Sequence, residues 1–257
     1  MRPNAVLSTS NSDVNVDSWK MELGADHVLS QRSDGATLIL GAIGGYSEAS
    51  AKVASVYGDG SIKTKGYSLG ATLTWFGSQG FYVDGRGQFT WFDSALMSAT
   101  LGRLAKGNDG NGEAYSLEVG KQWSLGGRFS LTQQVQMVYS TVSFERFVDP
   151  HGANVSSQLG DSLKTRWGIS LDRQDAKSMV YAVASLSYEW LDGTAADISG
   201  AAIARRSDRF WGELGLGANV ILASRLTFYT EASGKTSAHD FGDSYALKAN
   251  AGLRLAF

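Results

Sequence analysis

The chain has 257 residues, with 31 glycines, two prolines, no cysteine and a formal net charge of -2. This length suits one large all-β domain, and the scarcity of proline, which cannot donate to a β-ladder, favours long uninterrupted strands. The lack of cysteine excludes a disulfide scaffold and cysteine-ligated metals, and the near-neutral charge gives no reason to expect a nucleic-acid partner. No run of 18 apolar residues is present, so no transmembrane helix is predicted, and we expect neither a cofactor nor a metal site.

About eleven segments, taken in chain order, alternate apolar residues with small or polar ones. Successive side chains of a strand point to opposite faces, so each segment is predicted to be a strand with one apolar and one polar face. The segment 36–46 is apolar on both faces and is the least clear. The predicted strands are 18–27, 36–46, 65–76, 80–93, 115–123, 129–139, 163–171, 180–190, 210–220, 226–232 and 245–257.

The connections between these segments alternate in length. Outer-membrane barrels join their strands by short periplasmic turns and longer external loops in this alternation. The pattern therefore predicts an all-β fold, a transmembrane antiparallel up-and-down barrel. The short connections are 77–80, 125–128 and 223–225, and the long polar ones are near 51–62, 98–112, 148–160, 192–208 and 235–243.

Single-chain bacterial barrels have an even number of strands, so about twelve are expected where eleven are counted. The same alternation of loop lengths places the start of the strand at Trp19 outside the membrane. Residues 1–17 are then predicted to be an external loop or a truncated linker or strand, and residues 18–257 the barrel. The first strand is then either missing or misread.

The two faces predict two kinds of surface. Tryptophans in phase with the apolar face are expected at the membrane interface, namely Trp19, Trp75, Trp91, Trp167 and Trp190. Charged residues recur on the polar face and are predicted to line a lumen: Lys20, Glu22, Asp84, Arg86, Glu118, Lys164, Arg166, Glu189, Glu213, Glu231, Lys248 and Arg254. A soluble β-sandwich is the alternative, but it needs neither such long strands nor alternating loop lengths.

Four motifs and the carboxy-terminus carry a family resemblance. In order and spacing, the stretches 21–27 (MELGADH), 80–85 (GFYVDG), 115–120 (YSLEVG) and 210–217 (FWGELGLG), with the terminal Phe257, resemble the translocator domain of classical (type Va) autotransporters. The resemblance implies a twelve-stranded barrel integral to the bacterial outer membrane, preceded by a helix in its lumen, that exports a fused passenger to the cell surface. It implies no enzymatic activity.

The same resemblance implies partners. These are the passenger itself, outer-membrane lipid and lipopolysaccharide, and the barrel-assembly machinery, which reads the terminal Phe257 as an assembly signal. We expect a monomer. The loop residues Arg205, Arg206 and Arg209 are candidates for contact with lipopolysaccharide, although solvated loop charge is the commoner explanation of such residues.

Three other interpretations stay open at this stage. A porin for small solutes is the main one, because a polar lumen can conduct ions. The acidic residues of the polar face can form an acid–base pair, although pairing with the neighbouring arginines and lysines explains them more simply. His151 and His239, in predicted external loops near Asp149 and Asp240, are the basis for an enzyme alternative.

Overall fold

The structure is a computed structural model that describes residues 7–8, 12–55, 58–191, 193–199, 201–205, 208–239 and 241–256. The strands in this part of the chain form one sheet of eleven strands and one of five. Nowhere in these residues is there a helix long and apolar enough to cross a membrane.

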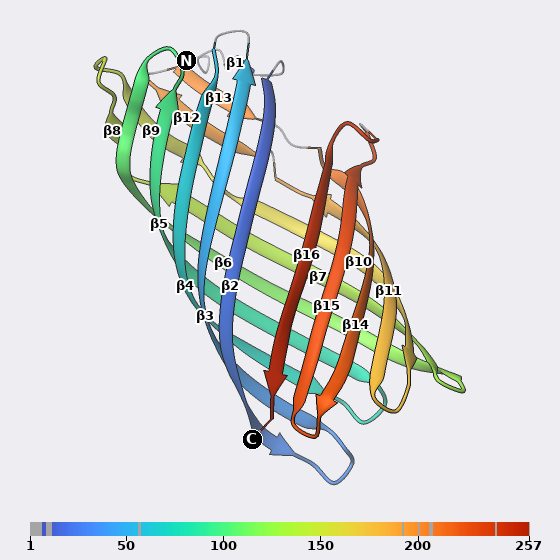
Figure 1. Cartoon of the computed structure of the whole chain (residues 1–257). Helices are drawn as coiled ribbons and strands as arrows, with labels where there is room; N and C mark the ends of the chain where they lie inside the picture. Colours follow the sequence, from blue (N-terminus) through green and yellow to red (C-terminus); the bar gives the residue numbers. More distant parts are fainter. Residues whose placement is uncertain are drawn as a thin grey trace.

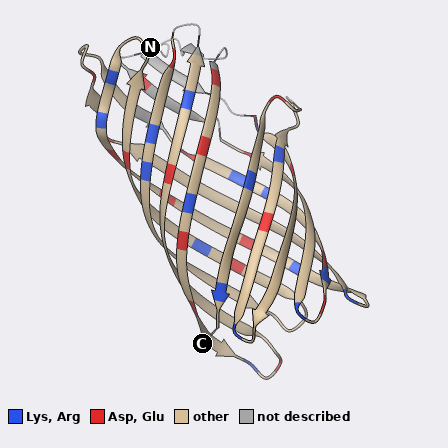
Figure 2. Cartoon of the chain, in the orientation of Figure 1, with Lys and Arg blue, Asp and Glu red and all other residues tan. Residues whose placement is uncertain are grey.

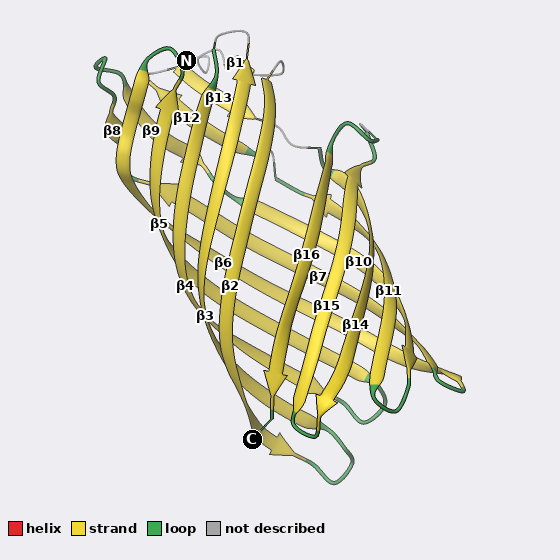
Figure 3. Ribbon diagram, in the orientation of Figure 1, coloured by secondary structure: helices red, strands yellow, loops and turns green. Residues whose placement is uncertain are grey.

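The larger sheet follows the chain from one edge to the other. Each strand pairs antiparallel with the next, and the sheet curls into a barrel-like wall (Figures 1 and 3). This confirms the predicted all-β, up-and-down fold. The strands are β2 (Ser12–Gln31), β3 (Thr37–Ser55), β4 (Gly60–Phe76), β5 (Phe81–Ser98), β6 (Gly102–Gly126), β7 (Phe129–Phe144), β10 (Ser162–Gln174), β11 (Ser178–Glu189), β14 (Phe210–Ala223), β15 (Leu226–Ser237) and β16 (Tyr245–Leu255).

The two edges of this sheet are β2 and β16. In an antiparallel series of eleven strands the first and the last run in the same direction, and Figure 1 shows both arrowheads at the end of the wall where the carboxy-terminus lies. An antiparallel ladder cannot form directly between two strands of the same direction. The eleven described strands therefore cannot close into an all-antiparallel barrel by direct pairing of β2 with β16.

Several strands are longer than the sequence pattern indicates. β2 begins at Ser12 instead of residue 18, β3 continues to Ser55, and β6 begins at Gly102. The long loops predicted at 51–62 and 98–112 were wrong for this reason, since most of those residues are in strands. Beyond the membrane both faces of a strand meet water, so the apolar–polar alternation no longer keeps the phase that it has in the membrane, although the backbone ladder continues.

The smaller sheet lies at the long-loop end of the wall (Figure 1). Its strands come from the loops after β7 and β11 and from the start of the chain, and β1 pairs in parallel with β13. The strands are β1 (Leu7–Ser8), β8 (Phe147–Val148), β9 (Asn154–Leu159), β12 (Thr194–Ile198) and β13 (Ala201–Arg205).

The convex face of the large sheet is apolar and exposed. Leu23, Leu214 and Leu247 have 77%, 70% and 81% of their surface accessible, and Ala36 is the one buried apolar residue in the described part of the chain. Buried residues are instead mostly small and polar, such as Ser233 and Ser237. A soluble protein hides its apolar residues, so this inverted distribution indicates that hydrocarbon covers the convex face.

Tyrosine rings on the concave face lie against glycines of the neighbouring strand. Tyr82 on β5 covers Gly120, Tyr181 on β11 covers Gly217, and the ring of Tyr229 on β15 lies in the same way over a glycine of β16. A Cβ added at Gly217 would sit 2.2 Å from Cζ of Tyr181, so only glycine admits the ring. These contacts fix the register between strand pairs at the short-turn end.

Gly217→Ala is expected to destabilise the folded barrel by about 1–3 kcal/mol, because the added methyl group overlaps the Tyr181 ring and the strand must shift. Urea titration of the refolded protein in detergent micelles measures the change. Gly212→Ala is the matched control on the same strand, since its Cβ meets only Leu186 Cδ2 at 3.9 Å. Equal midpoints for the two variants would contradict the packing argument.

Candidate functional site: the charged lumen and the aromatic girdle

The register places the predicted lumen residues on one face of the sheet. Asp84 pairs with Glu118, which pairs with Gln136, which pairs with Arg166, so charged residues continue from strand to strand on the same side. The remaining predicted residues follow the same parity: Lys20, Glu22, Arg86, Lys164, Glu189, Glu213, Glu231, Lys248 and Arg254. Figure 2 shows the mixed charges distributed along the strands of the curled wall.

Contacts that skip a strand identify this face as the concave one. Arg86 on β5 donates to Glu22 on β2 over 2.6 Å, although β3 and β4 lie between them in the sheet. Tyr181 on β11 likewise donates to Glu231 on β15 over 2.7 Å, past β14. Side chains converge on the inside of a curled sheet and diverge on the outside, so these pairs lie on the inner side of the wall, which faces the lumen.

Glu22 lies between two cations. Its carboxylate is 3.0 Å from Lys20 Nζ and 2.6 Å from Arg86 Nη2. The Arg86 guanidinium also donates to Gln88 over 2.8 Å, so its orientation is fixed on both sides. Charge-assisted hydrogen bonds are shorter and stronger than neutral ones, and here they tie β2 to β5 across the curve of the wall.

A second network centres on Glu118. Tyr82 donates to its Oε1 over 2.7 Å, and Arg166 donates to its Oε2 over 3.1 Å. The Tyr82 hydroxyl also lies 3.1 Å from the side-chain oxygen of Gln134, so side chains of β5, β6, β7 and β10 belong to one network. Arg166 Nε is buried and has no hydrogen-bond partner among the described residues, which leaves one donor of this network unused.

The other lumen carboxylates are held mainly by hydroxyl groups. Thr74 donates to Asp84 over 2.5 Å, and Ser233 donates to Glu213 over 2.6 Å. Glu189 accepts from Ser162 over 2.5 Å and from the Leu163 amide over 2.9 Å. The carboxylates are thus engaged in holding the wall together, which is the simpler of the two roles considered for them.

Two residues of the concave face, Lys235 and Asp172, were not predicted from the sequence pattern. Lys235 lies on the concave face of β15 opposite Glu213, with its Nζ 5.2 Å from the centre of the Trp211 ring, but residue 235 was assigned to a loop. Asp172 is buried and accepts hydrogen bonds from Thr132 over 3.1 Å and from Ser170 over 2.6 Å. Both residues lie in strands that continue further than predicted. Once the true strand ends are known, the alternation of side chains along the strand assigns both residues to the concave face.

An aromatic girdle lies on the convex face towards the long-loop end. The Trp19 ring is 5.4 Å from that of Tyr46, which is 5.0 Å from that of Tyr67, and Tyr67 pairs directly with Trp91 on β5. Trp91 in turn contacts Phe89 at 4.7 Å. Adjacent rings on four strands form a continuous band of the kind that marks a membrane–water interface.

The other predicted interface tryptophans lie at both ends of the wall. Trp75 is beside the short turn before β5, with its ring 6.0 Å from that of Phe81. Trp167 is exposed on the convex face of β10. Trp190 follows β11 at the long-loop end and donates from Nε1 to Thr165 over 2.9 Å.

The loop histidines have local contacts. The His151 amide donates to Asp149 Oδ1 over 2.9 Å, and the His239 amide donates to Ser237 Oγ over 3.1 Å. Neither contact aligns an imidazole with a carboxylate. Asp240, Arg206 and the predicted assembly signal Phe257 lie outside the described residues.

Comparison with known proteins identifies the family. The family model described as autotransporter beta-domain matches residues 6–233. The chain belongs to the autotransporter β-domain family. Over 259 aligned residues it is 36% identical to the adhesin BmaC autotransporter of Brucella suis biovar 1 (strain 1330), covering 96% of this chain and 8% of that protein. The chain thus spans less than a tenth of this relative's length.

Solved structures share the fold. The transport unit of the autotransporter AIDA-I from Escherichia coli superposes with a TM-score of 0.82 at 17% identity, covering 96% of this chain and 84% of that one. The β-domain of the Bordetella autotransporter BrkA gives 0.71 at 22% identity, covering 95% and 92%.

Membership in this family settles location and type of activity. Autotransporter β-domains are integral outer-membrane barrels that export a fused passenger in type V secretion, and they are translocators, not enzymes. The short-turn end of the autotransporter β-domain is accordingly periplasmic and the long-loop end extracellular.

Arg166→Met is expected to lower the free energy of unfolding by about 1–3 kcal/mol, because Glu118 loses a charged partner in a half-buried site. Lys20→Met is the control, since Lys20 is more exposed and Glu22 keeps Arg86. Urea unfolding in detergent measures both. If Arg166→Met, alone and combined with Glu118→Gln, changes stability no more than Lys20→Met does, the network is not a determinant of stability.

Proposed function

We propose that the passenger reaches the cell surface along the concave face of this β-domain, and that the predicted lumen residues line its path. The support is the combination of an apolar convex face with a continuous concave face of charged, hydroxyl and small residues. This face is the one surface of the large sheet on which a hydrated polypeptide can lie without meeting hydrocarbon.

The chemistry of the lumen suits passage better than binding. Its cations and carboxylates are largely engaged with each other or with hydroxyl groups, as in the Arg86–Glu22 and Arg166–Glu118 pairs. A passing backbone therefore finds many weak hydrogen-bonding partners and no concentrated charge of one sign. Such a wall hydrates a segment of any sequence and releases it again.

A twelfth strand, antiparallel to both β2 and β16, closes the barrel. It runs from the periplasmic end to the extracellular end between the two edges, so that 18–257 forms most of the barrel and residues 12–17 form the start of β2. The support is the shared direction of the two edge strands. Closure also removes two rows of unpaired backbone groups from the bilayer.

We propose two further partnerships and an oligomeric state. Phe257 acts as the signal read by the barrel-assembly machinery, the convex face contacts outer-membrane lipid and lipopolysaccharide, and the closed barrel works as a monomer. The exposed apolar face supports the lipid contact.

Cysteine cross-linking tests the path, because the chain has no native cysteine. In the full-length protein with its passenger arrested during export, Lys248→Cys is expected to form a disulfide with cysteines placed along the passenger. Leu247→Cys, one residue away on the convex face, is the matched control. Cross-links from position 247 but not from 248 would place the passenger outside the lumen.

A reporter tests the activity of the domain. A reporter joined to Met1 through the linker and first strand of the full-length protein is expected at the cell surface, measured by protease accessibility in intact cells. A barrel that is correctly inserted, as shown by heat-modifiable migration on gels, but that leaves the reporter inside would overturn the proposal. Large steady conductance in planar bilayers with the linker present would favour the porin alternative.

Hydrogen exchange tests the closing strand. In a chain extended upstream by this strand, backbone amides at the open edges of β2 and β16 are expected to exchange much more slowly, because both edges become hydrogen-bonded. The amides of β6, already paired on both sides, serve as an internal control. Unchanged exchange at both edges would show that the barrel closes in another way.

A further inference from the structure

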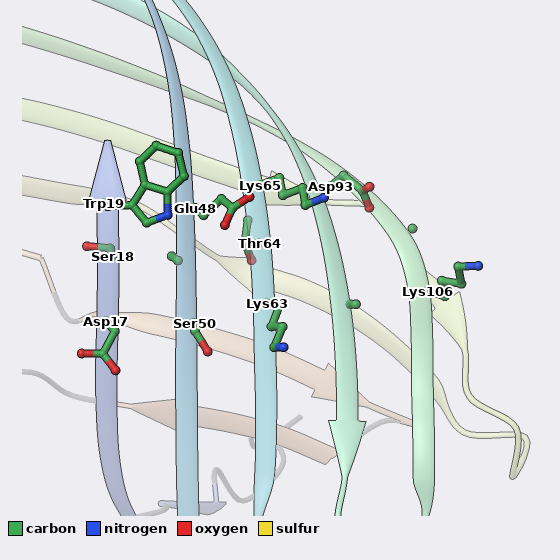
Figure 4. Close-up of a pocket in the computed structure, with 13 residues that line it drawn as sticks. Asp17, Ser18, Trp19, Glu48, Ser50, Lys63, Thr64, Lys65, Asp93 and Lys106 are labelled. Atoms are coloured by element: carbon green, nitrogen blue, oxygen red, sulfur yellow. The ribbon is translucent and has the colours of Figure 1, made fainter. Parts of the chain in front are cut away.

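A groove of about 630 Å³ lies on the extracellular part of strands β2 to β6 (Figure 4). Figure 4 shows Trp19, Glu48, Lys65 and Asp93 side by side on four successive strands, and Lys63 and Lys106 nearby. No step of passenger export described above uses these residues.

The charged residues of the groove point outward, not into the lumen. Trp19 pairs with Glu48, Glu48 with Lys65, and Lys65 with Asp93 in the ladders. Paired residues share a face, and Trp19 belongs to the convex aromatic girdle. Lys63 is two residues from Lys65 and has the same parity, so it too faces the surroundings of the barrel.

The aromatic girdle shows where the groove lies relative to the membrane. One step closer to the membrane on β3, β4 and β5, the outward residues are Tyr46, Tyr67 and Trp91. Beyond these aromatics the convex face is apolar. A line of charges directly above an interfacial aromatic band lies at the level of the lipid headgroups. At the extracellular end, these headgroups belong to the outer leaflet.

The lining combines three types of chemistry. Lys63, Lys65 and Lys106 have no carboxylate within 4.0 Å among the described residues, so their ammonium groups are available to an anion such as a phosphate. Glu48 and Asp93 offer acceptors for hydroxyl groups, and Glu48 is oriented by Tyr46, which donates to it over 2.5 Å. Trp19 presents an exposed ring face and an N–H donor.

Resting on the lipid contact proposed above for the convex face, we infer that this groove binds the phosphorylated sugar headgroup of an outer-leaflet glycolipid, the chemistry of lipopolysaccharide. The lysines contact phosphates, the carboxylates accept hydrogen bonds from sugar hydroxyls, and Trp19 covers a sugar ring. The acyl chains then lie along Tyr46, Tyr67 and the apolar strands below. A plain anionic phospholipid uses the lysines but has no sugar ring for the carboxylates and Trp19, so it fits the groove less well.

Copurified lipid tests the site in the full-length protein. The triple variant Lys63→Gln, Lys65→Gln, Lys106→Gln, extracted from outer membranes in mild detergent, is expected to retain at least about tenfold less lipopolysaccharide by quantitative mass spectrometry, the effect of losing one or more charge-assisted hydrogen bonds. Heat-modifiable migration on gels verifies that the variant is folded.

The matched control removes three cations at the periplasmic end: Arg128→Gln, Arg173→Gln, Lys177→Gln. Its lipopolysaccharide content is expected to equal that of the natural protein, because these residues face the other leaflet. If the two triple variants lose equal amounts of lipopolysaccharide, the loss reflects overall charge and the proposed site is wrong. Unchanged retention in the folded Lys63, Lys65 and Lys106 variant would overturn it as well.

Asp93→Asn separates sugar from phosphate recognition. This variant keeps all three lysines, so it is expected to bind lipopolysaccharide about tenfold more weakly and phosphatidylglycerol in mixed micelles unchanged. If phosphatidylglycerol binds the natural protein as tightly as lipopolysaccharide does, and Asp93→Asn alters neither, the groove is a simple anion site and the glycolipid assignment is wrong.

Discussion

The need to pair every backbone amide and carbonyl inside hydrocarbon governs this structure. Strands meet that need only when each ladder is shared on both sides, so the chain forms eleven antiparallel strands in sequence and curls them towards closure. Once the ladder is fixed, alternate side chains must face opposite media. The apolar convex face and the charged concave face are two consequences of this one constraint.

Stability in such a wall cannot come from an apolar core, since Ala36 is the one buried apolar residue in the described part of the chain. On the inside it comes from polar contacts that reach across one or two strands, such as Arg86 with Glu22, and from rings seated on glycines, such as Tyr181 on Gly217. Both depend on curvature, because only a concave face brings non-adjacent strands within reach. The same contacts that hold the curl also use up charge that would otherwise grip a passing polypeptide.

The sequence predicted the fold wherever the two faces of a strand meet different media. Strand β16 and the short turn before Phe81 were recognised in this way. The pattern failed beyond the membrane, where water covers both faces: residues 12–17 and 51–55 continue as strands, but their apolar residues, such as Val14, Val16 and Val53, have the parity of the polar face. Lys235 was missed for the same reason.

The sequence periodicity could not predict which side chains of the concave face contact each other. Parity assigns Glu22 and Arg86 to one face, but they meet only because β3 and β4 curve between them, and that curvature arises from the whole sheet. In the same way Trp19 was expected at the interface, whereas the band it forms with Tyr46 and Tyr67 depends on register between strands. The local sequence determines on which face a side chain lies, and the register and curvature of the whole sheet determine which residues it contacts.

The lengths of the strands give the two halves of the wall different heights. Strands β2 to β6 have 17–25 residues, whereas the last five strands of the large sheet, β10, β11, β14, β15 and β16, have 11–14. Figure 1 shows the first group extending further at the extracellular end. The extra length adds polar ladder above the girdle, which is where the groove at Lys63 and Lys65 lies. The extracellular end of the large sheet is therefore tall on the side of β2 to β6 and low on the side of β14 to β16. Because β2 and β16 are the two edges of the sheet, the step in height falls between these edges.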